Sequence, residues 1–115
     1  MLLNLSNHPS ENWPKNQLEI AINFYGSVID LAFPQINPHL DSDGLDSLVD
    51  QFEQQVQQIN PSVVHIMGEM TFTFRLVHRL KALGITCIAS TTERITEIED
   101  NTKTSIFKFV QFRNY

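Results

Sequence analysis

The chain has 115 residues, of which 42% are hydrophobic and 18% are charged. This length and composition are typical of one folded domain over residues 1–115 and exclude a disordered or collagen-like chain. The net charge of −5 is unlike the strongly basic charge of a general nucleic-acid coat protein.

The localisation signals are those of a soluble chain. No apolar run approaches the roughly 20 residues that a membrane span needs, and residues 1–5 lack the basic region of a signal peptide. The single cysteine, Cys87, excludes an internal disulfide and fits a reducing compartment. We therefore expect a soluble, cytoplasmic protein.

The first half of the chain predicts two strands and two helices. Residues 2–6 are expected to form a short buried strand and residues 7–12 a polar loop. A helix is expected from Pro14 to Gly26, because proline is tolerated at the first helical position and glycine favours a C-cap. Residues 27–33 predict a second strand.

The most regular helical pattern lies between residues 41 and 59. Asp41, Ser42 and Asp43 supply N-cap chemistry, and apolar residues then recur every three or four positions. Residues 62–67 predict a nearly apolar central strand. A third helix is expected after residues 68–71, ending near Leu83, and a fourth strand over residues 85–90.

The C-terminal part alternates in hydrophobicity over residues 94–99 and 104–112, with a turn at Asp100-Asn101. This pattern predicts an antiparallel hairpin. Strict alternation would also prevent Phe107, Phe109 and Phe112 from facing one side. The expected order is thus β-α-β-α-β-α-β-β-β, which favours an α/β, Rossmann-like three-layer fold with a mainly parallel sheet and a C-terminal antiparallel hairpin.

Three polar loops are expected at the carboxyl ends of the parallel strands, where open α/β sheets bind ligands. They are residues 7–10, 68–73 and 90–94. Residues 1–60 hold one Lys and eight acidic residues, whereas residues 61–115 hold seven Lys and Arg and five acidic residues, so the two parts carry −7 and +2. A polyanion would therefore meet the C-terminal part more readily.

The second of these loops favours a phosphate. Gly68 would let the backbone approach a ligand, and the N-terminus of the following helix would offer free N–H groups. Thr71 would add a hydroxyl donor. The alternative is that Glu69 and Thr71 merely cap the helix. The sequence lacks GxGxxG and the Walker lysine, which argues against a dinucleotide cofactor or a P-loop.

The other two loops also carry candidate groups. Thr91 and Thr92 offer hydroxyls, and Arg94 offers a cation for bidentate phosphate contacts, the alternative being a salt bridge with a neighbouring glutamate. His8 would move protons near neutral pH, unless it is an ordinary exposed histidine. Asn7 would orient a phosphate or a base edge.

Metal and nucleophile chemistry find little support. The four histidines are scattered and no CxxC pair exists, so we expect no metal and no cofactor. His65 lies in an apolar strand and is expected to be a satisfied core residue. Cys87 is expected to be inert in the core.

Several segments resemble a known family. Residues 3–9 with Gln17, residues 65–69, and residues 90–94 through to Phe112-Arg113 are similar to small single-domain CRISPR-associated accessory proteins of type III systems. These are CARF-like relatives of sensor domains, and several groups resemble ring nucleases. The resemblance implies binding of a cyclic oligoadenylate messenger, cyclic tetra-adenylate being the expected one, and its cleavage, which would switch off antiviral signalling.

The resemblance also implies how the ligand is held and cut. A homodimer would place the ring across its two-fold axis, without a membrane or a long nucleic acid as partner. The ribose 2′-hydroxyl would attack the adjacent phosphorus without metal and leave a 2′,3′-cyclic phosphate. His8 would be the acid or base and Arg94 the charge stabiliser.

By the same resemblance, the remaining ligand contacts would be Asn7, Ser10, Gly68, Glu69, Thr71, Thr91 and Thr92. Two alternatives remain open. The first is a binder that sequesters or senses the messenger without cleaving it. The second is a protein-interaction subunit that uses the C-terminal hairpin and the Gln-rich helix over residues 41–59.

Overall fold

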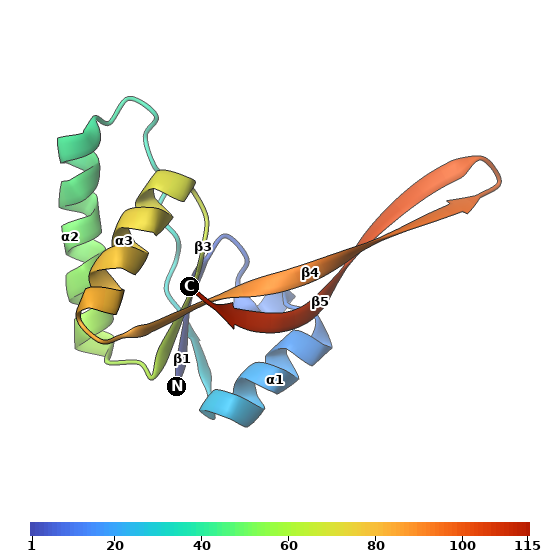
Figure 1. The fold of residues 1–115 in the computed structure, drawn as a ribbon, viewed down its shortest axis with the longest axis horizontal. Helices are drawn as coiled ribbons and strands as arrows, with labels where there is room; N and C mark the ends of the chain where they lie inside the picture. The colour runs from blue at the N-terminus through green and yellow to red at the C-terminus, as the bar shows by residue number, and fades with distance from the viewer.

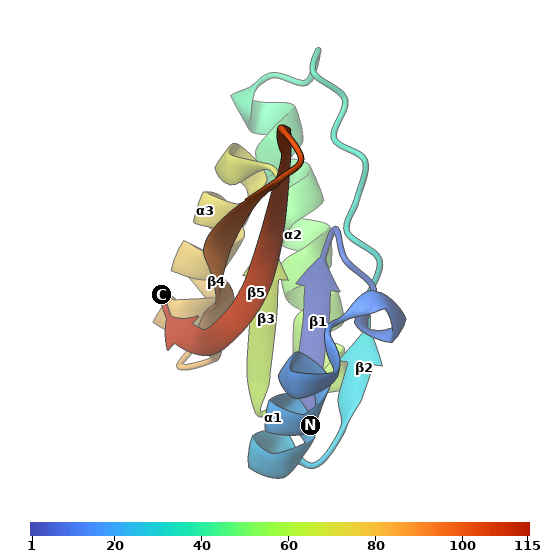
Figure 2. The same ribbon diagram turned by 90° about the vertical axis from the view of Figure 1, so that its right-hand side faces the viewer.

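The computed structural model describes residues 1–115 and forms an α/β fold around one five-stranded mixed sheet (Figures 1 and 2). The strand order is β2-β1-β3-β4-β5, parallel except for the antiparallel β4–β5 pair. The strands are β1 (Leu2–Ser6), β2 (Val28–Asp30), β3 (Val63–Met67), β4 (Thr86–Glu99) and β5 (Thr102–Asn114). The expected α/β class, the mainly parallel sheet and the C-terminal hairpin are confirmed.

Helices cover both faces of the sheet, as the two views show. A 3₁₀ turn, η1 (Ser10–Asn12), and helix α1 (Lys15–Tyr25) lie on one face. Helices α2 (Ser42–Ile59) and α3 (Met70–Ala82) lie on the other. None of these helices has the length and apolar character needed to cross a membrane.

The core lies mainly between the sheet and the α2–α3 layer. Leu3, Leu5 and Ile66 of the central strands are fully buried there against Leu76 and Leu80 of α3. A smaller cluster on the opposite face joins Trp13 and Ala21 to the other side of the same strands. Strands β1 and β3 are therefore buried on both faces, as their nearly continuous apolar sequences predict.

The helix ends form where the sequence places them. The side chain of Asp41 accepts a hydrogen bond from the Gly44 amide at 2.8 Å and caps α2, and Asn60 ends that helix with a φ of 55°. Gly26 follows α1 with a φ of 85°, a left-handed conformation that glycine adopts without a side-chain penalty.

The structure has five strands, one fewer than predicted, because β4 is a single long strand. Residues 90–94 are not a loop between two strands, because β4 continues through them from Thr86 to Glu99. Thr91 pairs with Gln111 and Arg94 with Phe107 in the β5 ladder. Adjacent threonines are β-branched and favour strand backbone, so a polar run at this position extends the strand rather than ending it.

Beyond Thr92 the β4–β5 pair leaves the body of the molecule as a long arm, visible at the right of Figure 1. At its tip, Asp100 and Asn101 have φ values of 50° and 64°. Two consecutive residues with positive φ are typical of a type I′ hairpin turn, which fits the twist of the strands. The predicted turn is confirmed.

A β-bulge corrects the prediction for the three phenylalanines of β5. The register shifts between Thr91 and Thr92, so that Val110 is an extra residue on the β5 side. The shift breaks the alternation, and all three rings lie on the α1 side of the sheet: Phe107 and Phe109 line one cavity with Trp13, and Phe112 packs against the cluster of Trp13 and Ala21. The rings of Phe109 and Phe112 are 5.0 Å apart.

Strand β2 is shorter than predicted, ending at Asp30 instead of continuing to residue 33. Only the Leu31 amide continues the contact with β1, donating to the Asn4 carbonyl at 2.9 Å. Phe33 turns into the α2–α3 layer, where its ring packs edge-on against Phe72 at 5.2 Å.

Candidate functional site

The three polar segments chosen from the sequence meet around Met67, at the carboxyl end of β3. The Asn7 amide donates to the Met67 carbonyl at 3.2 Å, and the Ser90 hydroxyl donates to the Met67 sulfur at 3.0 Å. Gly68 follows directly in the chain. The topology therefore brings the loop after β1, the end of β3 and the middle of β4 to one edge of the sheet.

A cavity of about 200 Å³ opens at this edge, on the α1 face, and we call it the rim pocket. Its aromatic walls are Trp13, Phe107 and Phe109. Its polar lining comes from Ser6, His8, Asn12, Gln17, His65, Ser90 and Thr92. Of the residues predicted to bind or cleave a ligand, His8 and Thr92 line this cavity.

The loop after β1 is held in place by side chains of β1. The Asn4 amide nitrogen donates to the His8 carbonyl at 2.9 Å and to the Asp30 carboxylate at 2.8 Å. Trp13 Nε1 also donates to the His8 carbonyl, at 3.0 Å. The backbone at His8 is thus fixed, while its imidazole remains exposed at the pocket.

Ser10 has a structural partner rather than a place in the pocket. Its hydroxyl and amide donate to the two carboxylate oxygens of Asp30 at 2.7 and 3.0 Å. Partial burial raises the pKa of Asp30, but the hydrogen bonds from Ser10 and Asn4 outweigh it and lower that pKa. Asp30 is therefore ionised near pH 7 and holds the loop by accepting hydrogen bonds from Ser10 and Asn4.

His65 is the residue whose role the sequence did not predict. It is only 2% exposed, and its Nδ1 lies 2.9 Å from Asn4 Oδ1. Burial, with a smaller contribution from the charge of His8, lowers the pKa of His65 to about 4. The imidazole is therefore neutral near pH 7.

The hydrogen-bond network assigns the tautomer of this histidine. Both donors of the Asn4 amide nitrogen are used by His8 and Asp30, so Asn4 presents its oxygen to His65. His65 must then carry its proton on Nδ1. Its Nε2 keeps a lone pair, is buried and has no hydrogen-bond partner, which departs from the satisfied core residue that was expected.

The N-terminus of α3, predicted as a phosphate cradle, already holds a carboxylate. Glu69 caps the helix, accepting from the Thr71 amide at 2.6 Å and the Phe72 amide at 3.3 Å. The Thr71 hydroxyl also donates to Glu69, and this bond is the main reason that the pKa of Glu69 is lowered. The alternative of simple capping matches these contacts, because the N–H groups that a phosphate needs are taken.

Packing explains why residue 68 is a glycine, and the sequence alone did not reveal this. A Cβ atom at this position would lie 2.3 to 2.7 Å from three ring atoms of Phe33. The close approach of Phe33 from the same chain is therefore enough to explain why residue 68 is a glycine, and the ligand contact at Gly68 stays a prediction.

The run Thr91 to Arg94 alternates across strand β4. The Thr91 hydroxyl donates to the Gln111 carbonyl at 3.2 Å, within the β4–β5 ladder. Thr92 faces the rim pocket, and Arg94 lies on the same face, opposite Phe107. Arg94 donates to the Ser105 hydroxyl at 3.1 Å, toward the tip of the arm, forms no salt bridge, and is not among the residues that line the pocket.

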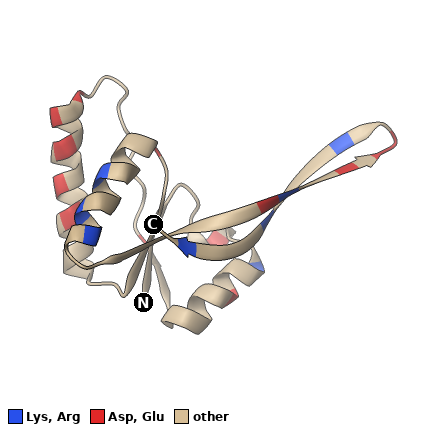
Figure 3. Ribbon diagram, in the orientation of Figure 1, with Lys and Arg blue, Asp and Glu red and all other residues tan.

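Two of the cations counted in the C-terminal part are neutralised locally. Arg79 on α3 pairs with Asp50 and with Glu53, and Arg75 pairs with Asp46 at 3.0 Å. Figure 3 shows the acidic positions along α2 and the basic positions on the neighbouring helix α3. The Lys and Arg side chains that form no salt bridge are Lys81 on α3 and Arg94, Lys103, Lys108 and Arg113 on the β4–β5 pair, which also carries Glu93, Glu97 and Glu99.

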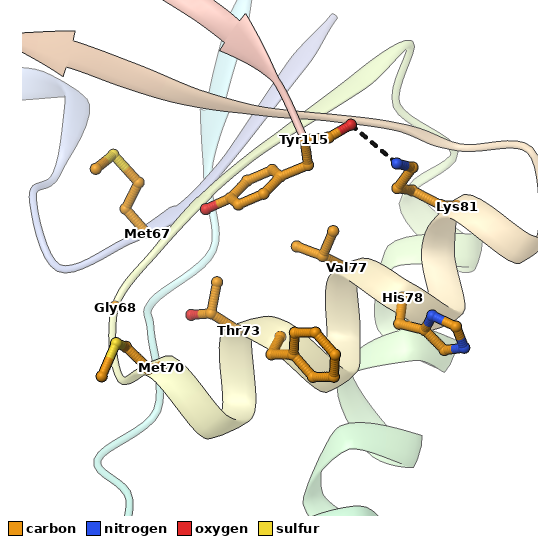
Figure 4. A pocket seen from close by; sticks show the side chains of 9 residues that line it. Met67, Gly68, Met70, Thr73, Val77, His78, Lys81 and Tyr115 are labelled. Atoms are coloured by element: carbon orange, nitrogen blue, oxygen red, sulfur yellow. Dashed lines mark hydrogen bonds between the residues drawn. The ribbon is translucent and has the colours of Figure 1, made fainter.

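A second cavity, of about 570 Å³, lies between α3 and the end of β5. Figure 4 shows Met67, Val77 and Tyr115 around it. Lys81 Nζ in its lining donates to the Tyr115 carbonyl at 2.9 Å, and the Thr73 hydroxyl oxygen is the one polar side-chain atom of the lining that is buried without a hydrogen-bond partner. This cavity is mostly apolar and lacks the converging polar groups of the rim pocket.

The structure has no cluster of three or more His, Cys, Asp or Glu residues arranged to hold a metal ion. Cys87 is buried, and burial raises the pKa of its thiol to about 11. A thiol of this kind is a poor nucleophile, in agreement with the core role expected for it.

Comparison with known proteins gives one relationship. The model of the uncharacterized protein MJ1673 family matches residues 1–113, and the chain belongs to this family. No curated protein and no solved structure matches the chain.

Proposed function

We propose that this member of the MJ1673 family has a Rossmann-like, CARF-like fold and binds a cyclic oligoadenylate in the rim pocket. The observation that carries the proposal is the pocket itself, which joins aromatic walls and polar groups at the carboxyl ends of β1 and β3. This is the edge where open parallel sheets hold their ligands. The resemblance to type III accessory proteins supplies the ligand class.

The pocket suits a nucleobase. Of the aromatic lining residues, Phe107 is exposed, whereas Trp13 and Phe109 are mostly buried, so Phe107 is the ring on which a base would stack; stacking on an aromatic ring contributes about 1–3 kcal/mol per base. A volume of about 200 Å³ admits one base but not a whole oligonucleotide ring. A ring-shaped ligand would therefore be shared, with a second copy of the chain related by a two-fold axis.

Phosphates of such a ligand would lie along β4. Thr92 offers a hydroxyl in the pocket, and Arg94 on the same face offers a planar cation for two phosphate oxygens. The Glu69 carboxylate repels an anion from the α3 terminus, so the phosphates avoid residues 68–71. Asn7, the first residue of the loop after β1, would contact the ribose or a phosphate.

Cleavage of the ring is a second candidate, and the position of His8 favours it. His8 lines the pocket with an exposed imidazole. In the proposed step it takes the proton of a ribose 2′-hydroxyl, a 2′-oxygen–phosphorus bond forms, and the bond to the 5′-oxygen breaks. The leaving 5′-oxygen then takes a proton from solvent water and His8 returns its proton to the solvent, giving a linear product with a 2′,3′-cyclic phosphate and a 5′-hydroxyl.

Binding is better supported than cleavage, because the pocket lining includes no Lys or Arg to stabilise charge on the attacked phosphate. His65 is a poor second base near pH 7, since its pKa is about 4. Arg94 stands outside the lining and would have to reach in. We therefore place capture of the messenger first and its cleavage second.

One experiment separates these functions. The purified chain is mixed with cyclic tetra-adenylate in EDTA, and bound ligand and products are followed by calorimetry and chromatography. Intact, retained ligand with a melting temperature several degrees higher supports capture. Linear products over many turnovers support cleavage. An unchanged melting temperature across a panel of cyclic nucleotides, with linear tetra-adenylate as control, overturns the proposal and favours a protein-interaction subunit.

A further inference from the structure

The rim pocket contains a hydrogen-bond acceptor that the protein itself does not satisfy. His65 lines the pocket, is 98% buried, and its Nε2 has no partner. Leaving a buried acceptor unpaired costs roughly 1–3 kcal/mol, so such atoms usually have a donor in the working state. The structure thus points to a donor that comes from outside the chain.

The acceptor cannot turn into a donor by a simple ring flip. Asn4 presents its oxygen to Nδ1, and Asn4 is itself fixed by its bonds to His8 and Asp30. Flipping the imidazole would remove the nitrogen from Asn4 and leave that oxygen with one partner fewer. The ring is also held edge-on between Trp13 at 5.2 Å and Phe112 at 5.6 Å.

We infer that Nε2 of His65 is the specificity-determining acceptor of the rim pocket and takes a hydrogen bond from the exocyclic amine of an adenine base. This inference rests on the proposed function and deepens it. The amine is the suitable donor because aromatic side chains flank the pocket, and a flat base fits between them better than a ribose. A base with an oxygen in place of the amine would set two acceptors against each other.

The test compares cyclic tetra-adenylate with cyclic tetra-inosinate, in which each amine is replaced by oxygen. We expect the wild-type chain to bind the inosine ring at least about tenfold more weakly, the effect of losing one hydrogen bond in a buried site. A ring of 2′-O-methyl adenosines is the matched control, because it lacks the ribose 2′-hydroxyl donor but keeps the adenine amine. This ring should bind with the affinity gain that depends on adenine.

The variant that isolates the acceptor is His65→Asn. An asparagine amide reaches the position of Nδ1, and so keeps a donor for Asn4, but it has no atom at the position of Nε2. The ratio of the two affinities should fall from about ten or more to near one. Should the variant fail to fold, the ¹⁵N resonance of Nε2 in the wild-type protein gives the same information, because accepting a hydrogen bond moves it.

The possible results separate this inference from the proposed function. Failure of the wild-type chain to bind cyclic tetra-adenylate removes the function. Equal affinity for the adenine and inosine rings removes only the role of His65. The same holds if the preference for adenine over inosine disappears when the riboses are 2′-O-methylated, because a hydroxyl would then be the donor. An Nε2 resonance already shifted in the free protein and unchanged by ligand would assign the bond to an internal water and also overturn the inference.

Discussion

Asn4 and His65 are paired across the two central strands: they occupy the same register position of β1 and β3, and Oδ1 of Asn4 lies 2.9 Å from Nδ1 of His65. The same asparagine donates to the His8 carbonyl. A single buried amide therefore couples the centre of the sheet to the loop that carries the candidate catalytic histidine.

This pairing predicts a stability that depends on pH. Because the folded pKa of His65 is about 4 and its ordinary value is 6.5, the unfolded chain binds the proton first as pH falls. The contribution of neutral His65 is complete above pH 6.5 and is lost between pH 6.5 and 4. The free energy of unfolding should decrease by about 3 kcal/mol over this interval, measured by urea denaturation.

The His65→Asn variant is the control for this measurement, since it has no imidazole to titrate. Its stability should stay nearly level from pH 7 to pH 5, above the range where Asp30 and Glu69 take up protons. An equally steep fall in the variant would assign the pH dependence to other groups.

Replacement of Gly68 by alanine should destabilise the fold. The new Cβ would lie within 2.7 Å of the Phe33 ring, so the ring must move out of the core. Overpacking of this kind costs typically 1–3 kcal/mol, visible as a lower melting temperature. The double variant Gly68→Ala with Phe33→Leu should lose less stability than the two single changes added together, and strict additivity would contradict the explanation.

Replacement of Glu69 by alanine should weaken the start of α3. The change removes the acceptor for the Thr71 and Phe72 amides, and loss of an N-cap costs about 1 kcal/mol. Thermal unfolding measures this effect. Glu69→Asp, which retains a carboxylate suited to N-caps, should recover part of the loss. If the alanine variant is as stable as wild type, the cap contributes nothing.

Replacement of Arg94 by alanine should weaken binding of cyclic tetra-adenylate about tenfold without changing the melting temperature of the free protein. Arg94 is exposed and its one side-chain partner is Ser105. Lys103→Ala is the matched control, since Lys103 lies on the same face nearer the tip of the arm. Equal loss of affinity in both variants would indicate a general charge effect.

Replacement of His8 by alanine should slow cleavage, if cleavage occurs, far more than it weakens binding. The imidazole is exposed, and the bonds from Asn4, Ser6 and Trp13 go to the backbone carbonyl, which alanine keeps. Single-turnover rates measured with saturating protein isolate the chemical step. An unaltered rate would exclude His8 from proton transfer.

The sequence predicted the elements whose signals are local. The caps at Asp41 and Gly26 and the turn at Asp100-Asn101 depend on neighbouring residues alone, and all three are confirmed. Strand β4 was divided wrongly because a polar, threonine-containing run is compatible with either a loop or an exposed strand. Pairing with β5, a partner more than ten residues away at this point, decides between them.

The candidate site was predicted in position but not in composition. Alternation of strands and helices brings residues 7–10, 67–68 and 90–92 to one edge, because carboxyl ends of parallel strands lie together. The sequence held no sign that Phe33 sits against Gly68 or that Asn4 faces His65. Both contacts join residues more than thirty positions apart, and only the packed sheet reveals them.

Strand β5 forms one border of the sheet, so one row of its backbone groups has no neighbouring strand. Such a border attracts strands from other molecules and is a common starting point for aggregation. Lys103, Lys108 and Arg113 recur every five residues along it. If two β5 strands from different molecules paired in register, these like charges would lie against each other. Their repulsion disfavours backbone pairing between two copies of β5.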